Sequence, residues 1–357
     1  MPSEVLPAMR DEYKSFRPMI DTKSTNLLKG LICSTVDNLE NTTSGVRAIR
    51  IGNGATFTNE MAGDTIYERH FYPKLVSAIR CADVRVLLLG NPGTGKSVFQ
   101  FYLLARYLNP SLFADAPLSG PIEFGSDAIP KVVVRHEPER RTRVWFLEQQ
   151  VVQAISSTSN IETVLECFDP ATTLYFFEPG TMNDGPFADT SVVVPTLATV
   201  SSNRDCYHEF TKLSAELFMP VFTEEELLAV GRDMKSRRGF KSNLQDLYSD
   251  DGIRFRFATF NGIIRHVLPR NQAVLDTMYR KRAFALNTVE PAKFLSGIIE
   301  DQSVSHYVAV YTVGLDADGS YDFAKVAMAP PSEEVTTKLR DLLNTNGRHD
   351  VPTKVSQ

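Results

Sequence analysis

The sequence is poor in cysteine and lacks long apolar runs. Its four cysteines are scattered, with no Cys-x-x-Cys pair and no histidine at ligand spacing: Cys33, Cys81, Cys167 and Cys206. We therefore expect reduced thiols in a reducing compartment. Because no run of about 18 apolar residues occurs and the N-terminal segment does not read as a signal peptide, neither membrane spanning nor classical secretion is expected. An intracellular, soluble protein of the nucleus or cytoplasm is the prediction.

An excess of positive charge is also missing. The chain has 38 Lys and Arg against 43 Asp and Glu, a formal net charge of -5, so no global positive field drives binding to nucleic acid. The densest basic run, RHEPERRTR at 135–143, lies between two apolar runs. It is predicted to be a turn that faces water. The alternative is a local patch that contacts nucleic acid.

The 357 residues, 43% hydrophobic and 23% charged, have the composition of an ordinary globular protein. Strand-like apolar runs alternate with helical patterns, which predicts an α/β fold with a parallel sheet. The expected strands are 84–89, 131–134, 143–148, 172–180 and 195–203. The expected helices of this part are 96–108, which ends before Asn109-Pro110, and about 148–167.

Beyond this α/β part the pattern becomes mainly helical. Thr223 and Glu226 stand at capping-box spacing before one helical run, and the end of the chain reads as a β-hairpin followed by an amphipathic helix at about 332–343. Four parts are predicted: an irregular N-terminal extension at 1–65, a P-loop NTPase core at 66–215, a helical lid at 216–290 and a hairpin-helix appendix at 291–357.

The segment GNPGTGKS begins at Gly90 and fits the pattern Gly-x-x-x-x-Gly-Lys-Ser. Glycines let the backbone fold around a phosphate with its N–H groups pointing inward. Lys96 would reach the β- and γ-phosphates, and the Ser97 hydroxyl would coordinate Mg²⁺, at the positive end of the following helix. The predicted nucleotide-binding residues are Gly90, Asn91, Pro92, Gly93, Thr94, Gly95, Lys96, Ser97 and Val98.

A carboxylate at the end of a neighbouring buried strand is the next requirement, because a phosphate loop alone does not hydrolyse nucleotide. Glu178, after the run LYFF, is the predicted Mg²⁺ ligand; the alternative is an acid that merely ends a strand at the surface. Pro179 and Gly180 follow it, so no second acid stands there. Slow or absent hydrolysis is therefore expected.

Two further groups are candidates for contact with the γ-phosphate. Ser202 or Asn203, at the end of the third strand, would act as a polar sensor, although helix-capping serines are an equal alternative. Arg265 starts a helix in the lid, from which it could offset charge in phosphoryl transfer. The six histidines show no partner spacing and are predicted to be surface or structural residues.

Taken together, these stretches resemble the P-loop NTPase module shared by Crinkler effectors and retrotransposon hot spot (RHS) proteins. The matching stretches lie in the family's order between Arg85 and Leu268: LLLGNPGTGKSVFQFYLLARYL, TLYFFEPG, TVSSNRDCYHEFTK, LFMPVFTEEELLAVGR and RFATFNGIIRHVL. The resemblance implies an AAA-like or STAND-like ATPase core with a helical lid. It places Lys96 and Ser97 in the phosphate loop, Glu178 on the Mg²⁺-binding acid, Ser202 on the sensor strand and Arg265 on the lid arginine.

The sequence also departs from the family pattern. FGGIPR reads FNGIIR here, with Asn261 for a glycine and Ile264 for the proline, and Glu178 stands where aspartate is common. No nuclease-like or kinase-like domain and no secretion module is evident, although an effector of this type would be delivered to a host cell.

Three functions stay open at this point. The first is an MgATP-dependent switch or weak ATPase whose lid closes and changes contacts with an unknown protein partner, including nucleotide-dependent oligomerisation. The second is an effector scaffold in which nucleotide is structural. The third is a nucleotide-dependent protein that processes nucleic acid through the basic run at 135–143. The sequence does not separate ATP from GTP.

Overall fold

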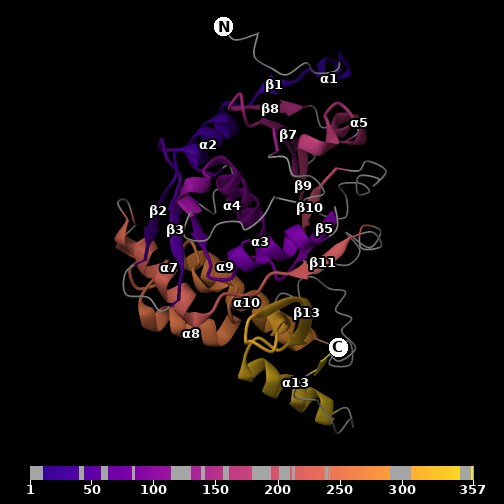
Figure 1. Ribbon diagram of the computed structural model, residues 1–357. Coiled ribbons are helices and arrows are strands. Elements are labelled where there is room, and N and C mark those ends of the chain that lie inside the picture. Colours follow the sequence, from indigo (N-terminus) through magenta and orange to yellow (C-terminus); the bar gives the residue numbers. More distant parts are fainter. Residues whose placement is uncertain are drawn as a thin grey trace.

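The computed structural model describes residues 11–39, 44–57, 63–82, 85–113, 130–137, 141–155, 161–178, 194–200, 210, 214–237, 240, 242–289, 307–345 and 355–356. Its centre is an eight-stranded sheet in the order β1-β8-β7-β6-β9-β10-β5-β11 (Figure 1). The strands are β1 Met19–Ile20, β5 Arg85–Leu89, β6 Val132–Glu137, β7 Arg141–Phe146, β8 Val151–Ile155, β9 Thr173–Phe177, β10 Thr196–Thr199 and β11 Ala215–Phe218.

Five neighbouring strands of this sheet, β6, β9, β10, β5 and β11, are parallel. The other three, β7, β8 and β1, extend it with antiparallel pairs. The prediction of an α/β fold with a largely parallel sheet is confirmed. Strand β10 lies between β5, which leads into the predicted phosphate loop, and β9, which leads into Glu178, so the carboxyl ends of all three meet at one edge.

Helices cover both faces of the sheet because its central strands are apolar on both sides. Val86 and Leu88 belong to one core cluster and Leu87 and Leu89 to another, and all four are buried. This continuous burial is typical of parallel strands. The helices of this part are α1 Asp11–Ser15, α2 Thr22–Ile32, α3 Tyr72–Cys81, α4 Lys96–Leu108 and α5 Ile161–Leu165, with short 3-10 turns at Pro110–Phe113 and Pro170–Thr172.

The predicted lid is helical, and its helices lie together below the sheet in Figure 1. They are α7 Glu224–Ser236, α8 Asp250–Phe260, α9 Ile264–Val267 and α10 Gln272–Thr288, with a 3-10 turn at Ser242–Leu244. Thr223 and Glu226 form the predicted capping box at the start of α7. Within the described residues, no helix combines the length and the apolar character needed to cross a membrane.

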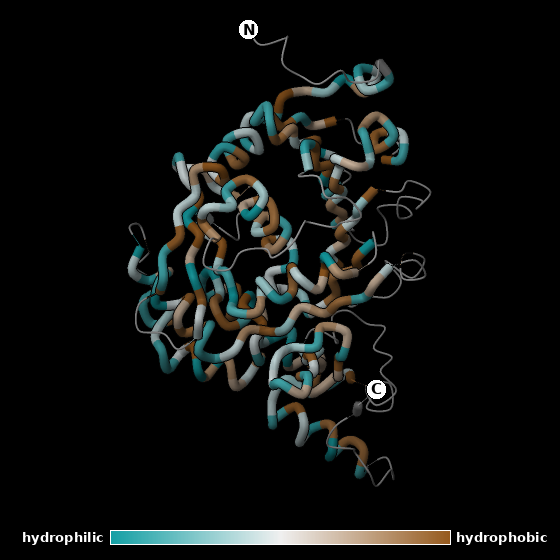
Figure 2. Tube along the Cα trace, viewed as in Figure 1, coloured by the Kyte–Doolittle hydropathy of each residue, from teal (hydrophilic) through white to brown (hydrophobic). Residues whose placement is uncertain are grey.

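The C-terminal hairpin and helix are confirmed. Strand β12 Val310–Leu315 pairs with β13 Tyr321–Ala329, which also pairs with β14 Val355–Ser356, and α13 Glu333–Thr345 follows the hairpin. In Figure 2 hydrophobic and hydrophilic residues alternate along α13, and Val335, Leu339 and Leu343 form its buried side.

Two expectations about secondary structure are wrong. The N-terminal part is not irregular: it contributes β1, α2 and a second sheet formed by β2 Thr35–Asn38, β3 Arg47–Arg50 and β4 Thr65–Glu68. The helix expected at about 148–167 is a strand, β8, followed by the short α5. The run VVQAI is rich in β-branched residues, and pairing with β7 satisfies its backbone groups along one whole side.

Candidate functional site

The phosphate-loop sequence connects β5 to α4 in a conformation that requires glycine. Gly90, Gly93 and Gly95 have φ angles of 152°, 81° and 94°, a region that side chains disfavour. A β-carbon on Gly93 would also lie 2.9 Å from Cβ of Arg265. No side chain caps the start of α4, so the first N–H groups of this 13-residue helix are free to face a ligand.

Lys96 is buried beneath this loop and bonds to it. Its Nζ donates to the carbonyl oxygens of Gly90 (2.7 Å) and Asn91 (2.9 Å). The pKa of Lys96 is lowered to about 7, chiefly by burial; the charge of Glu178 opposes this shift, and the charge of Arg265 adds to it. An anion bound in the loop would therefore raise the pKa of Lys96 and would compete with the two carbonyl oxygens for hydrogen bonds from its Nζ.

Glu178 lies beside the loop, as predicted, because β9 ends at the same edge as β5. The Ser97 hydroxyl donates to its Oε1 at 2.5 Å. Burial raises the pKa of Glu178, and the Ser97 hydrogen bond and the Lys96 charge offset part of the increase. A serine oxygen next to one carboxylate is a ligand pair that suits Mg²⁺, which completes its octahedron with water and phosphate oxygens.

The described residues contain no group of three or more acidic, histidine or cysteine side chains that could hold a metal ion. A metal at the loop would therefore depend on Ser97, Glu178 and oxygens from a bound nucleotide. This arrangement fits Mg²⁺ bound with a nucleotide better than a resident metal held by the protein alone.

Arg135 is a third charged residue at this site, and sequence reasoning missed it. It lies on β6, next to β9, and only 4% of its surface is exposed. Its Nη2 is 3.0 Å from Oε2 of Glu178, and its Nε donates to Oε1 of Gln100 at 3.0 Å. It also forms an ion pair with Glu137. The charge of Arg135 is therefore shared between Glu178 and Glu137.

The prediction that 135–143 is a turn facing water is wrong at both ends of the run. Arg135 and Arg143 are opposite each other in the antiparallel pair of β6 and β7, and both are buried. Glu137 is ion-paired with both arginines, and Asp21 accepts from Arg143 at 2.7 Å. These two arginines are internal, so they are not part of an exposed nucleic-acid patch.

Gln100 connects the helix after the loop to β10. It is fully buried, and its Nε2 donates to Oγ1 of Thr199 at 3.0 Å. Sequence reasoning missed this residue too, although a glutamine one turn after Lys96 in an apolar helix was a signal. Ser202 and Asn203, the predicted sensor residues, follow β10 but lie outside the described residues.

Arg265 lies at the mouth of the loop. Its backbone nitrogen would be 3.6 Å from a β-carbon on Gly93, and its charge contributes to the lowered pKa of Lys96. The side chain is exposed, and no hydrogen bond or ion pair joins it to another residue in the described parts of the chain. The next residue, His266, is buried and stacks on Tyr307 with ring centroids 5.1 Å apart.

The segment before Arg265 explains how the helical part of the chain reaches the loop. Asn261 has φ 57° and ψ -159°, a region that is essentially restricted to glycine. A β-carbon on Gly262 would lie 1.8 Å from the carbonyl oxygen of Phe222, so this position requires glycine. The Phe222 N–H also donates to the Gly262 carbonyl at 2.9 Å. This close approach holds the start of α9 against the main chain of Phe222, which lies between β11 and α7.

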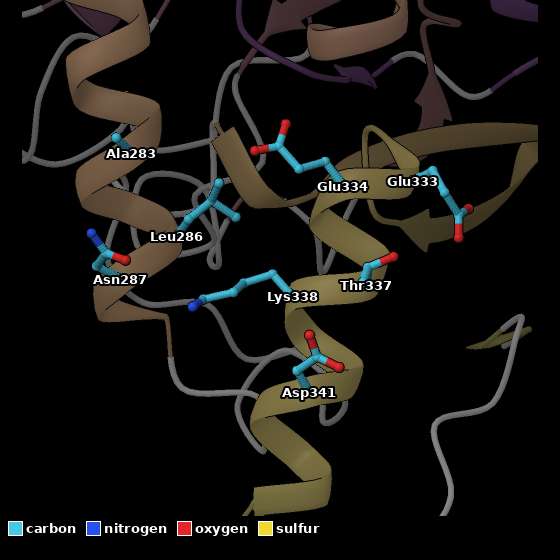
Figure 3. A pocket seen from close by; sticks show the side chains of 8 residues that line it. All are labelled: Ala283, Leu286, Asn287, Glu333, Glu334, Thr337, Lys338 and Asp341. Carbon is cyan, nitrogen blue, oxygen red and sulfur yellow. The ribbon is translucent and has the colours of Figure 1, made fainter.

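A separate cleft of about 590 Å³ lies between α10 and α13 (Figure 3). It is lined by Ala283, Leu286, Asn287, Glu333, Glu334, Thr337, Lys338 and Asp341. Charges of both signs are mixed among these side chains. This cleft shares no residue with the phosphate loop.

The sequence matches no family model and no curated protein. Among solved structures, a chain from work on the structural basis of katanin self-assembly aligns with a TM-score of 0.30 at 14% identity. The alignment covers 62% of the present chain and 66% of that chain, which is less than two thirds of its length. A similarity at this level supports no conclusion about the function.

Proposed function

We propose that the protein is an MgATP-binding P-loop NTPase of the Crinkler/RHS type that acts as a switch or weak ATPase. One observation carries the proposal: Lys96, Ser97 and Glu178 converge at the start of α4, beneath a loop with three glycines at positive φ. The resemblance in five ordered stretches supports the family assignment.

Each residue has a role in this proposal. The backbone N–H groups of the loop and the Lys96 ammonium would bind the phosphates. Ser97 and Glu178 would hold Mg²⁺, which would neutralise phosphate charge. Arg265, exposed beside Gly93, would approach the γ-phosphate from the lid. Ser202 or Asn203 would be the polar sensor.

Slow hydrolysis follows from the surroundings of Glu178. Its two oxygens are engaged by Ser97 and Arg135, and Pro179 and Gly180 follow it in the sequence. The sequence therefore offers no second acid directly after Glu178 to orient an attacking water. The switch would depend on binding and lid closure more than on rapid turnover.

Calorimetric titration of wild type and Lys96→Ala with MgATP tests this function. Lys96 would form charge-assisted hydrogen bonds to phosphate, so its loss should weaken binding by about a hundredfold or more. Lys131→Ala is a matched control, because Lys131 is an exposed lysine that forms an ion pair with Glu148. Equal binding by Lys96→Ala and wild type would refute the proposed site.

The second candidate is a scaffold that binds nucleotide without turnover, and the arginine contact to Glu178 favours it. Phosphate release by wild type and Glu178→Gln separates the two functions. A wild-type rate that is clearly above that of Glu178→Gln supports the weak ATPase. Equal rates at background level, with MgATP still bound, support the scaffold.

A further inference from the structure

The side chain of Asn91, the second residue of the phosphate loop, contacts the C-terminal hairpin. Its Nδ2 donates to the carbonyl oxygen of Tyr311 at 2.9 Å, and its Oδ1 accepts from the Tyr311 N–H at 3.0 Å. These residues are 220 positions apart in the chain. The carboxamide thus pairs with both main-chain groups of Tyr311, as a peptide group of a neighbouring strand would.

The contact with Asn91 occurs on the edge strand of the hairpin sheet. Strand β12 is at the edge of its sheet, and Tyr311 is opposite Met328 of β13. Residues in an antiparallel pair alternate between those bonded to each other and those that direct their N–H and C=O outward. Because both groups of Tyr311 bond to Asn91, the contact uses groups that β13 does not use.

The main chain of the same asparagine supports the loop from within. Its carbonyl oxygen accepts from Nζ of Lys96 at 2.9 Å and from Oγ1 of Thr94 at 2.9 Å. Asn91 is only 2% exposed. One buried residue therefore joins the phosphate-binding lysine to β12. A movement of Tyr311 would be transmitted to Lys96 through Asn91, and a movement of Lys96 would be transmitted to Tyr311 in the same way.

Other contacts keep the hairpin docked independently of Asn91. Lys74 on α3 bonds to Asp316 at 2.7 Å, and Phe71 packs against Tyr321 and Phe323 with centroid distances of 5.3 and 5.9 Å. The hairpin thus has a fixed position from which it can hold the loop. Removal of the Asn91 carboxamide should not detach it.

We propose that strand β12 is a positioning element for the phosphate loop: the Tyr311 main chain holds Asn91, and nucleotide affinity therefore depends on the C-terminal hairpin. This inference rests on the proposed function. A loop held in its binding conformation loses less freedom when the ligand arrives. By linkage, bound nucleotide should in turn stabilise the contact with Tyr311.

Asn91→Ala in the full chain tests the proposal. Loss of two neutral hydrogen bonds that preorganise the loop should weaken MgATP binding by about tenfold. In wild type, MgATP should also slow hydrogen exchange at the Tyr311 amide, and this protection should be lost in the variant. Thr312→Val is the control: it removes a hydrogen bond to Ala327 within the hairpin and should leave MgATP affinity unchanged.

A second variant addresses the same contact from the hairpin, in case Asn91→Ala folds poorly. Tyr311→Pro removes the N–H that faces Asn91 and keeps the carbonyl, whereas Tyr311→Ala changes only the side chain. We expect about threefold weaker MgATP binding for Tyr311→Pro than for Tyr311→Ala.

The outcomes distinguish this inference from the proposed function. Normal MgATP binding in Asn91→Ala and Tyr311→Pro, without protection of the Tyr311 amide, would overturn the inference and leave the nucleotide site intact. Absence of MgATP binding in wild type would overturn both. A merely structural role would lower the unfolding midpoint of Asn91→Ala without changing nucleotide affinity, and this result too would overturn the positioning role.

Discussion

Two arginine–glutamate pairs in this protein, one fully buried and one partly buried, have opposite electrostatics. Arg69 and Glu226 join the segment before α3 to helix α7, and Arg135 and Glu178 lie beside the predicted phosphate loop. In the first pair, burial alone would raise the pKa of Glu226, but the Arg69 charge and hydrogen bonds from His70, Arg69 and Thr223 lower it to about 2. In the second, burial prevails and the pKa of Glu178 is raised.

The difference lies in how completely each pair is satisfied. Arg69 donates to both oxygens of Glu226 and to the carbonyl groups of Pro220 and Val221. Arg135 instead divides its charge between two acids. In the first pair, Arg69 fully neutralises the charge of Glu226. In the second, Arg135 neutralises the charge of Glu178 only in part. A divalent cation would supply the missing positive charge, which is why the second pair is the better candidate for a ligand site.

The same substitution at each acid should give the largest contrast. Glu226→Gln leaves the Arg69 charge buried without a counter-charge, which should destabilise the protein by about 3–5 kcal/mol. Glu178→Gln should change stability by less than about 1 kcal/mol, because folding already disfavours the ionised carboxylate. Urea unfolding of both variants measures the difference. Similar losses in the two variants would contradict the comparison.

The stability of the protein at low pH should also distinguish the two pairs. Because the pKa of Glu226 falls from 4.5 to about 2 on folding, its ion pair contributes stability that is complete above pH 4.5 and lost as the pH falls toward 2. The contribution is on the order of 3 kcal/mol. Urea midpoints of wild type should therefore fall steeply over this range, and those of Glu226→Gln should fall less. Parallel pH profiles would argue against the lowered pKa.

Nucleotide affinity should depend on the protonation of Lys96. Its pKa of about 7 means that the free protein loses the ammonium charge as the pH rises through 7, whereas bound phosphate would hold the proton. MgATP binding should thus weaken by about tenfold from pH 6 to pH 8, with proton uptake in calorimetry. Lys96→Arg keeps its charge, so its affinity should change little over the same range. A flat wild-type profile would refute the lowered pKa.

The smallest expected effect concerns the lid segment that reaches the loop. Asn261 occupies a backbone region that costs an ordinary residue about 1–3 kcal/mol. Asn261→Gly should therefore stabilise the protein by about 1 kcal/mol, after loss of the hydrogen bond from the Gly262 N–H to the Asn261 side chain. Asn261→Ala keeps the strain and loses that bond, so it should destabilise. Thermal unfolding should show a higher midpoint than wild type for Asn261→Gly and a lower midpoint for Asn261→Ala.

The sequence predicted those parts of the site that depend on local pattern. The glycine spacing requires a particular turn, and the apolar runs before Gly90 and Glu178 require buried parallel strands, so their ends meet. Arg265 was predicted from its place at the start of a lid helix, and it lies beside Gly93.

The sequence could not predict contacts that depend on strand register or on distant partners. Whether Arg135 faces Glu178 or water is decided by the pairing of β6 with β7 and β9. A shift of one residue would turn the side chain to the other face. The bond between Asn91 and Tyr311 joins positions 220 residues apart, and no local pattern indicates it.

The most direct test of the central claim is the Mg²⁺ dependence of ATP binding in wild type and Glu178→Gln. If Ser97 and Glu178 hold the ion with the nucleotide, Mg²⁺ should tighten ATP binding to wild type by at least about tenfold, and most of this gain should disappear in Glu178→Gln. The same gain in both proteins would contradict the metal role of Glu178. No ATP binding by wild type at any Mg²⁺ concentration would contradict the nucleotide site itself.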